Sequence, residues 1–416
     1  MSVSDVQPDA PLGERVAYFR RRLGLSQIEL ARVVGRSESW LSQVERGARS
    51  VDRLSVLTEL ANALGVSVTD LSPGAPAEER PELPPSEEAQ YVDRIRQALI
   101  GHPALGVALG ATRKDGSEGS LAKLREDAAQ VWELTHSARY REVAALLADV
   151  LPDLENAARA QPEDSGRDLR EALSQTYQAA SAVLAALDEP EGAWLAADRA
   201  AFVAESAGHR ALMLASQHRL ALAFLITDRL DYARLVADRA VEAAAPIVGE
   251  AELDPELLSV WGALHLVLAV VASRAGLRSA ARDHLGAAKD AGKRLGVDRN
   301  DFHTEFGPTN VALHAVAVAV ELGDAGEALD RAERIDASAL SAERRARLLI
   351  DVARANAQLR RSAEAVAALA EAEGLTPEQV RDHRFVRETV RDLLQLAGRR
   401  PAPELRALAQ RIGVAP

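Results

Sequence analysis

Near the amino end, apolar positions recur three and four residues apart in two short stretches, which places them on one face of two helices. Ser26 and Ser37 each precede one stretch, where helix N-caps belong. Glu29 follows Ser26 by three residues and completes a capping box. Gly35 provides the turn between the stretches. The pattern predicts a helical hairpin whose buried positions are Ile28, Leu30, Ala31, Val34, Leu41 and Val44.

Helical periodicity continues on both sides of this hairpin. A leading helix is predicted over Leu12–Leu23, with apolar residues on one face and arginines around the other. A further helix is predicted over Leu54–Gly65, and a short one over Val68–Leu71 closes the unit. The result is a five-helix domain over residues 12–72, and residues 1–11 before it are expected to be disordered. The arginines of the leading helix, which either serve DNA or only solvate the helix, are Arg15, Arg20, Arg21 and Arg22.

Four short motifs within this domain follow a known pattern. They are Leu25-Ser-Gln27, Glu29-Leu-Ala31, Gln43-Val-Glu45-Arg-Gly47 and Ala63-Leu-Gly65-Val66. With these motifs, residues 12–72 resemble the phage-repressor family of helix-turn-helix domains, also called the Cro-like or xenobiotic-response-element family. The resemblance implies that the second helix of the hairpin enters the major groove of a double-stranded DNA operator, while the first helix crosses the phosphate backbone.

The resemblance also implies a role for each polar residue of the hairpin. Base reading falls to Glu38, Ser39, Ser42 and Gln43, with simple solvent exposure as the alternative for the first three. Backbone contacts fall to Gln27, Arg36, Ser37, Arg46 and Arg49. Trp40 stands where the family commonly has a small hydroxyl residue, and it either packs inward or touches a thymine methyl or a sugar. Glu45 is expected to brace the fold.

The rest of the chain is predicted to form a second, entirely helical domain. Residues 73–86 hold five prolines and little apolar bulk, which is typical of a semi-stiff linker. From residue 87 to residue 416, strand signals are absent, and aromatic residues make up only 4% of the chain. A glycine-containing loop is expected over 101–119. The fold class is therefore predicted to be all-α.

Small apolar residues recur at similar offsets along this second domain. They are Val143, Leu147 and Val150; Ala193, Ala197 and Ala200; Ala233, Ala237 and Ala240; Ala281, Leu285 and Ala288; Ala328, Ala332 and Ile335; and Ala365, Leu369 and Ala372. Such residues let two antiparallel helices approach closely, and the pattern resembles tetratricopeptide repeats. We call the first residue of each group its anchor. Successive anchors are 37 to 50 residues apart, which is more than the repeat length of ~34 residues in that family. We therefore expect an α-solenoid of about six hairpins, with an irregular helical bundle as the alternative.

A stacked array of hairpins presents a concave surface that is lined by the first helix of each hairpin. Extending the register backward from each anchor places polar residues on that surface. An asparagine there pairs with both groups of a peptide bond, and arginines hold a carboxylate or phosphate. Any one of these residues, taken alone, is equally well explained by an ordinary hydrogen bond between helices or by exposure to solvent. Only the residues taken together therefore indicate an effector site. Its members are Arg125, Trp132, Gln175, Gln178, His218, Asn310, His314, Arg347 and Arg354, with His265 nearby.

Charge is unevenly distributed along the chain. The 416 residues carry a net charge of −12, but residues 12–53 hold nine arginines against five acidic residues, a net charge of +4. The remainder is therefore at −16. This asymmetry is typical of a basic nucleic-acid-binding end on an acidic body. The acidic body is expected to limit non-specific binding to DNA.

Residue patterns that would support catalysis or metal binding do not occur in this sequence. There is no cysteine, no glycine-rich phosphate loop with a lysine and no His-Glu-x-x-His helix. The nine histidines lack ligand spacing, and His102, His136, His209 and His303 are expected at the surface. The most apolar stretch, Val260–Ala272, is too short to span a bilayer, and no signal peptide is expected. We expect no enzymatic activity, no cofactor, no metal and no membrane partner.

Together these features predict a cytoplasmic regulator of transcription, in which residues 12–72 read an operator and residues 87–416 sense an effector, dimerise or both. The combination resembles the peptide-pheromone-sensing regulators of bacteria, which implies a homodimer and a peptide or small-molecule effector in the groove. One alternative is that the repeats bind a folded protein partner. Another is a large antitoxin that represses its own operon, although the ~340 additional residues argue against it.

Overall fold

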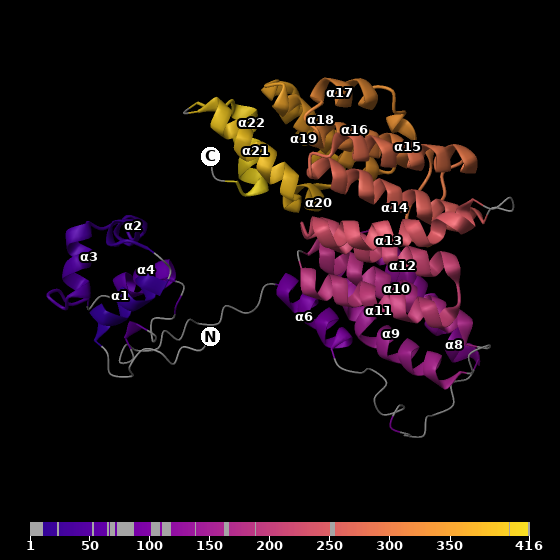
Figure 1. Ribbon diagram of the computed structural model, residues 1–416, viewed down its shortest axis with the longest axis horizontal. Coiled ribbons are helices and arrows are strands. Elements are labelled where there is room, and N and C mark those ends of the chain that lie inside the picture. Colours follow the sequence, from indigo (N-terminus) through magenta and orange to yellow (C-terminus); the bar gives the residue numbers. More distant parts are fainter. Residues whose placement is uncertain are drawn as a thin grey trace. The chain divides into compact units, whose positions relative to one another are not determined.

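The structure of the chain is a computed structural model, shown in Figure 1. It describes residues 11–22, 25–51, 54–64, 66, 71–72, 87–100, 109, 118–137, 139–161, 166–187, 189–249, 254–398 and 400–414. All regular structure in these ranges is helical, which confirms the predicted all-α fold class. The predicted linker over residues 73–86 lies outside these ranges. So do the predicted disordered amino end, except for residue 11, and most of the predicted loop over residues 101–119. Contacts divide the chain into two compact units, Met1–Pro85 and Ser86–Pro416.

In its described part, the first unit contains four helices around one core. They are α1 (Leu12–Arg22), α2 (Gln27–Val33), α3 (Glu38–Glu45) and α4 (Leu54–Leu64). Ser26 caps α2 in a complete capping box and Ser37 caps α3, as predicted. Of the predicted closing helix only Leu71 is described. The core consists of Val16, Phe19, Leu30, Ala31, Leu41, Leu60, Ala61, Leu64 and Leu71.

One predicted core position of the hairpin is wrong. Ile28 is 53% exposed. It lies two residues from Leu30, and at 3.6 residues per turn this separation places the two side chains on opposite faces of α2. The seven-residue helix buries only Leu30 and Ala31. Val34 ends α2 as its C-cap and lies half-buried against the core.

Helices α1 and α3 approach each other most closely at Gly13. A Cβ atom at this position would lie 2.4 Å from the carbonyl oxygen of Val44 and 2.7 Å from that of Glu45. Both carbonyls belong to the last turn of α3, so a larger residue would push the two helices apart. The glycine therefore allows the start of α1 to hold the end of α3 in place.

The second unit is built from six consecutive helical hairpins, as predicted (Figure 1). First helices contact one another along the array, and each second helix contacts the first helix of the following hairpin. The hairpins are α8 (Glu118–His136) with α9 (Tyr140–Ala160), α10 (Arg167–Ala186) with α11 (Pro190–Ala207), α12 (Arg210–Ile226) with α13 (Leu230–Val248), α14 (Pro255–Arg274) with α15 (Arg278–Leu295), α16 (Pro308–Glu321) with α17 (Ala325–Ala332), and α18 (Ala342–Gln358) with α19 (Ser362–Leu375).

Shorter elements flank and interrupt the hairpins. Helix α6 (Glu87–Leu99) precedes them and packs on α9. Helices α20 (Pro377–Asp382), α21 (Arg384–Ala397) and α22 (Pro403–Ile412) follow them, and α21 packs on α18. The short 3₁₀ helices are η2 (Asp301–His303) and η3 (Ala337–Ala339). The hairpins thus form a continuous stack whose last member is covered by α20, α21 and α22.

The predicted small residues lie on the buried face of each second helix. The residues that are buried there include Val143, Leu147, Ala193, Ala197, Ala200, Ala233, Ala237, Ala281, Ala288, Ala328, Ala365, Leu369 and Ala372. Leu285 is half-buried, as are Ala332 and Ile335, and the last lies beyond the end of α17. Alanine at these positions brings the paired helices close together, and the stack buries their common face.

Helix α14 is the centre of the second unit. It extends beyond the predicted apolar stretch, Val260–Ala272, at both ends. Among the described helices it alone has the length and composition needed to cross a membrane. Within the fold, however, 89% of that segment is buried among the neighbouring helices. A core helix of this kind is apolar on all sides because it contacts protein on all sides.

Candidate DNA-binding surface and effector groove

Helix α3 presents a polar edge beside a buried apolar one. The Ser37 hydroxyl accepts a hydrogen bond from the Trp40 amide at 3.2 Å, which satisfies a free donor at the start of the helix. Leu41 and Val44 are buried against the core. The residues that face outward from α3 are Glu38 and Ser39, which are exposed, and Ser42 and Gln43, which are half-buried. This arrangement is the one that the base-reading prediction requires.

Aromatic and cationic side chains flank that edge. Trp40 is half-buried against the core, which favours the inward packing that the sequence left open. The Arg36 guanidinium lies 5.7 Å from the centre of its ring and 3.8 Å from the carboxylate of Glu59. The Arg46 Nε donates to the Ser42 carbonyl at 3.1 Å, and the Arg49 side chain is exposed. All three cations are therefore at the surface on the two sides of α3.

A buried ionic network holds α3 against the other helices. Glu45 accepts two hydrogen bonds from Arg20 of α1, at 2.6 and 2.9 Å, and one from the Gln27 amide at 2.7 Å. Arg20 also donates to the Leu25 carbonyl at 2.7 Å. Burial alone would raise the pKa of Glu45, but the hydrogen bonds from Arg20 and Gln27 lower it below its ordinary value.

This network changes two expectations and agrees with a third. Arg20 is buried, so it neither faces DNA nor solvates the leading helix. Gln27 lies at the start of α2, where a phosphate contact was predicted, but its amide nitrogen is bonded to Glu45. Glu45 braces three helices, as its predicted structural role requires.

In the second unit, several predicted groove residues meet in pairs. Trp132 Nε1 donates to the Gln175 carbonyl at 2.9 Å, which joins α8 to α10. The Gln178 amide donates to the Ser216 hydroxyl at 3.1 Å, and both residues are buried between α10 and α12. Arg125 stands apart from them at the surface of α8, 3.5 Å from the carboxylate of Asp168. These contacts are interhelical, and they engage the side chains of Trp132, Gln178 and Arg125 and the backbone carbonyl of Gln175.

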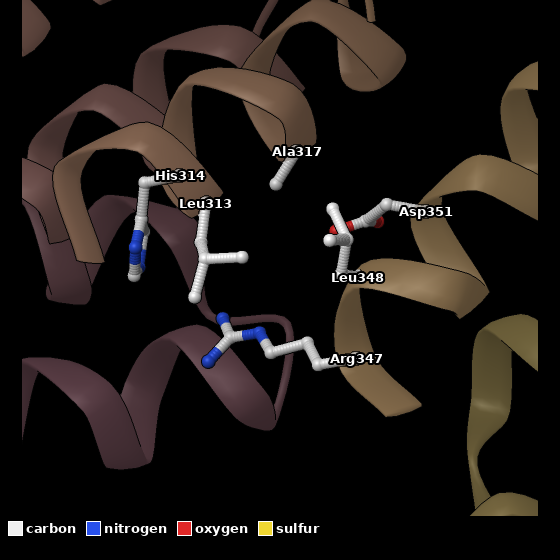
Figure 2. A pocket seen from close by; sticks show the side chains of 6 residues that line it. All are labelled: Leu313, His314, Ala317, Arg347, Leu348 and Asp351. Carbon is white, nitrogen blue, oxygen red and sulfur yellow. The ribbon is translucent and has the colours of Figure 1, made fainter. Parts of the chain in front are cut away.

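A second group of predicted residues surrounds a small cavity between α16 and α18 (Figure 2). The His314 Nδ1 lies 2.9 Å from the Asn310 carbonyl oxygen. Figure 2 shows the Arg347 guanidinium beneath Leu313, on the His314 side of the cavity, and Asp351 on the opposite side. The cavity has a volume of about 10 Å³, which is room for about one water molecule. Its lining residues are Leu313, His314, Ala317, Arg347, Leu348 and Asp351.

Burial makes the histidines near this cavity hard to protonate. Burial, with smaller contributions from Arg219 and His314, lowers the pKa of His218 to about 3. Burial likewise lowers the pKa of His314 to about 3, with a further contribution from Arg347. Both histidines are therefore neutral near pH 7, and each acts as a hydrogen-bonding group and not as a charge.

The two remaining predicted residues are engaged elsewhere. Arg354 bonds to Glu321 at 3.0 Å and to Asp351 at 3.4 Å, and its guanidinium lies 4.1 Å from the ring centre of Phe385 on α21. His265 Nδ1 lies 3.0 Å from His284 Nδ1. The predicted set therefore separates into several contacts and does not form one open site. Among the described residues, no three histidine or acidic side chains come together to hold a metal.

Comparison with known proteins identifies the first unit. A family model described as a helix-turn-helix domain matches residues 11–73. The uncharacterized HTH-type transcriptional regulator y4dJ of Sinorhizobium fredii is 41% identical over 70 residues, which cover 17% of this chain and 87% of that protein. The chain belongs to the HTH-type transcriptional regulators. It is a DNA-binding protein, and the match places its DNA-binding domain at the amino end.

A solved structure also aligns with most of this regulator. It is Bacillus thuringiensis PlcR in complex with the peptide PapR7 and DNA, which covers 68% of this chain and 95% of that chain at 12% identity. The TM-score of this alignment is 0.26.

Sequence reasoning missed one cluster in the second unit of this regulator. The Arg219 guanidinium lies 5.1 Å from the ring centre of Trp132, and the His303 ring stacks on Trp132 at 4.0 Å with an interplanar angle of 14°. His303 was expected to be a surface residue, yet it is half-buried. The helical register selects His218, and Arg219 is its immediate neighbour. His303 lies between two helices, where no periodicity predicts what a side chain contacts.

Proposed function

We propose that this regulator is a cytoplasmic homodimer that reads a two-fold symmetric operator and acts by binding, not by catalysis. The observation that carries the DNA-reading part is the polar edge of α3, with Gln43 at its centre and Arg36, Arg46 and Arg49 around it. The Glu45 network fixes the angle of that helix before DNA arrives. A pre-positioned recognition helix loses little conformational entropy on binding.

The test of this proposal is the variant Gln43→Ala. We expect it to weaken operator binding by about 1–3 kcal/mol and to relax discrimination at one base pair, because a bidentate amide contact to a base edge is lost. Selection of bound sites from random DNA supplies the operator, and a binding titration measures the affinity. The matched control is Gln130→Ala, which changes an exposed glutamine of α8. Parental affinity and an unchanged footprint for Gln43→Ala would show that α3 is not the reading helix.

Exposed apolar side chains support a dimer that forms through the second unit. Phe202 on α11 is 73% exposed, and Tyr232 and Leu235 on α13, the second helix of the next hairpin, are also exposed. Large apolar residues that gather at a surface commonly mark a protein interface. Helix-turn-helix dimers bind half-sites about one helical turn apart, so selected sites should be symmetric at that spacing. Phe202→Ser with Tyr232→Ser should then yield a monomer by light scattering.

An effector that binds the repeat unit would control the dimer. The supporting observation is the row of polar and cationic side chains along the first helices, from Trp132 to Arg347. The cavity beside His314 holds about one water, and another cavity, among α13, α14 and α15 beside His284, offers about 70 Å³. A drug-sized ligand needs about 300–1,000 Å³. The effector is therefore either small or enters as the helices move apart.

A further inference from the structure

One segment of the second unit crosses from the fourth hairpin to several others. Residues 296–307 connect α15 to α16, yet their side chains contact helices that lie far away in the sequence. Phe302 meets the His209 ring edge to face at the start of α12, and His303 stacks on Trp132 of α8. Glu305 accepts a hydrogen bond at 3.0 Å from Arg344 of α18. We call residues 296–307 the crossing segment.

The backbone of the crossing segment is strained. Phe302, His303 and Glu305 have φ angles of 49°, 60° and 50°, in the left-handed region that non-glycine residues rarely adopt. Such a conformation is energetically unfavourable and persists only where its surroundings hold it in place. Displacing this segment would therefore release strain as well as break contacts.

The ring of Trp132, on which His303 stacks, also contacts a buried cation that has no anionic partner among the described residues. The Arg219 side chain is 9% exposed and faces the Trp132 ring. Its guanidinium forms no ion pair and donates no hydrogen bond to any residue that the structure describes, and its Nε is fully buried. Burial lowers the pKa of Arg219 to about 10, and no neighbouring carboxylate offsets that cost. A charged group left unpaired in the interior is strongly unfavourable.

The acidic residues of the crossing segment do not neutralise Arg219, because each is engaged elsewhere. Asp298 accepts from the Thr309 amide at 3.0 Å, and Asp301 accepts two hydrogen bonds from Arg299. Glu305 is bonded to Arg344, as described above. His303 brings a second unsatisfied group, since its Nδ1 is buried without a hydrogen-bond partner among the described residues. The cluster thus offers free hydrogen-bonding groups from two separate elements, Arg219 on α12 and His303 in the crossing segment, and no negative charge.

We propose that Arg219, together with Trp132 and His303, forms a binding site for one compact anionic group, a carboxylate or a phosphate. The inference rests on the proposed effector function and names the chemistry of the effector. The guanidinium would donate paired hydrogen bonds to the anion, which is the geometry that arginine offers to carboxylates and phosphates. The ring of Trp132 would flank the ligand. The crossing segment covers the site, so it moves off Trp132 to admit the anion and then returns His303 as a donor.

The test compares thermal unfolding of the full chain in sodium phosphate, sodium acetate and sodium chloride at equal ionic strength and neutral pH. Two further arms use a short peptide with a free carboxyl end and the same peptide with an amidated end. We expect at least one oxyanion to raise the Tm above the chloride value as its concentration rises. Phosphate alone, acetate alone or the free-ended peptide alone would each identify a different source of the anionic group.

The deciding variant is Arg219→Met, which keeps the length of the side chain and removes its charge. It should weaken oxyanion binding about 10–100-fold, as expected for the loss of charge-assisted hydrogen bonds. In chloride it should melt no lower than the parent, because it removes an unpaired buried charge. The matched control is Arg274→Met, since Arg274 is a buried arginine near two carboxylates, of Glu321 and Asp228. That variant should melt lower in chloride and still respond to the anion.

Two outcomes would overturn the site: no oxyanion raises the Tm above the chloride value, or Arg219→Met keeps the full response. Operator binding is measured on the same samples with and without the responding anion. If the response depends on Arg219 but the operator affinity does not change, the anion site is supported and effector control is lost. If the operator is not bound at all, the DNA-reading proposal fails independently of the anion site.

Discussion

A single carboxylate, that of Glu45, connects three helices of the DNA-binding unit. It lies at the end of α3, accepts from Arg20 of α1 and accepts from Gln27 of α2. Both partners of the ion pair are largely buried, with side chains 10% and 5% exposed. In such a place the geometry decides whether the pair stabilises the fold, because desolvation opposes the attraction. Here every contact is a short hydrogen bond, so the pair is well satisfied.

The variant Glu45→Gln should show that this network stabilises the first unit in a pH-dependent way. The folded-state pKa of Glu45 is lowered, so its ionised form contributes stability above the ordinary pKa, and that stability is lost as pH falls through the folded value. At neutral pH we expect the variant to lose about 1–3 kcal/mol of unfolding free energy. Denaturant titrations at several pH values measure it.

The matched control is Glu38→Gln, which changes an exposed carboxylate at the start of the same helix. It should leave the unfolding free energy of the first unit almost unchanged, because exposed side chains away from special contacts contribute little. A Glu45→Gln variant as stable as the parent between neutral pH and pH 4 would contradict the structural role of the network.

At the scale of helices, regular elements could be predicted from residue patterns and the contacts between distant elements could not. The caps Ser26 and Ser37 and the alanine positions of the second helices obey local rules of spacing, and the structure confirms them. The crossing segment obeys no such rule. Two of its contacts, the stack of His303 on Trp132 and the edge-to-face contact of Phe302 with His209, join residues more than 80 positions apart, and only the folded stack brings them together.

The same limit explains why the sequence predicted the helix faces of the groove residues but not the contacts that their side chains make. The register selected Gln178 because of its face on α10, but it did not indicate that the Ser216 hydroxyl would accept a hydrogen bond from its side-chain amide. Burial of an unpaired charge, as at Arg219, is a property of three elements together. It leaves no pattern in the sequence of any one of them, because an arginine beside a histidine is unremarkable by itself.

The packing of the crossing segment on α14 leads to a prediction at the element scale. Phe306 is fully buried, and a Cβ atom added at Gly262 would lie 2.1 Å from the Cζ of its ring. Gly262→Ala should therefore destabilise the second unit by about 1–3 kcal/mol, or displace the crossing segment, because overpacking forces neighbouring groups to shift. Calorimetry measures the loss, and the same Gly262→Ala change should cost less in a chain that also carries Phe306→Ala, because the ring that it meets is gone.

Gly286→Ala on α15 is the matched control, because nothing lies within 4 Å of the Cβ atom that it adds. Here the substitution should stabilise the second unit by about 0.5–1 kcal/mol, since alanine loses less conformational entropy than glycine in a helix. The two glycine variants are thus expected to change the Tm in opposite directions. A parental Tm for Gly262→Ala would mean that Phe306 does not pack on α14.

At the scale of the whole molecule, the chain separates its chemical tasks between two units. Residues 12–53 carry a net charge of +4, and the rest of the chain carries −16. The two units also have separate hydrophobic cores. The basic segment over residues 12–53 attracts DNA at long range, and the acidic remainder of the chain opposes non-specific contact, so the charge pattern favours specific sites over bulk DNA. The distribution of histidines divides the chain in a similar way.

All nine histidines lie at or beyond residue 102, so the first unit has none. In the second unit, burial lowers the pKa of several of them, to about 3 for His218 and His314 and about 4 for His265, His303 and His383. An unfolded histidine has a pKa near 6.5. As pH falls below that value, the unfolded chain takes up protons that the folded unit refuses, so stability is full above pH 6.5 and declines toward pH 4.

Calorimetry of the full chain should therefore show two transitions whose Tm values depend differently on pH. The transition of the second unit should shift to lower temperature between pH 6.5 and pH 4, while that of the histidine-free first unit should stay nearly constant down to about pH 5, where carboxylates begin to protonate. The fragment Ser86–Pro416 should reproduce the pH-sensitive transition alone. A single transition, or equal shifts of both, would show that the two units do not unfold independently.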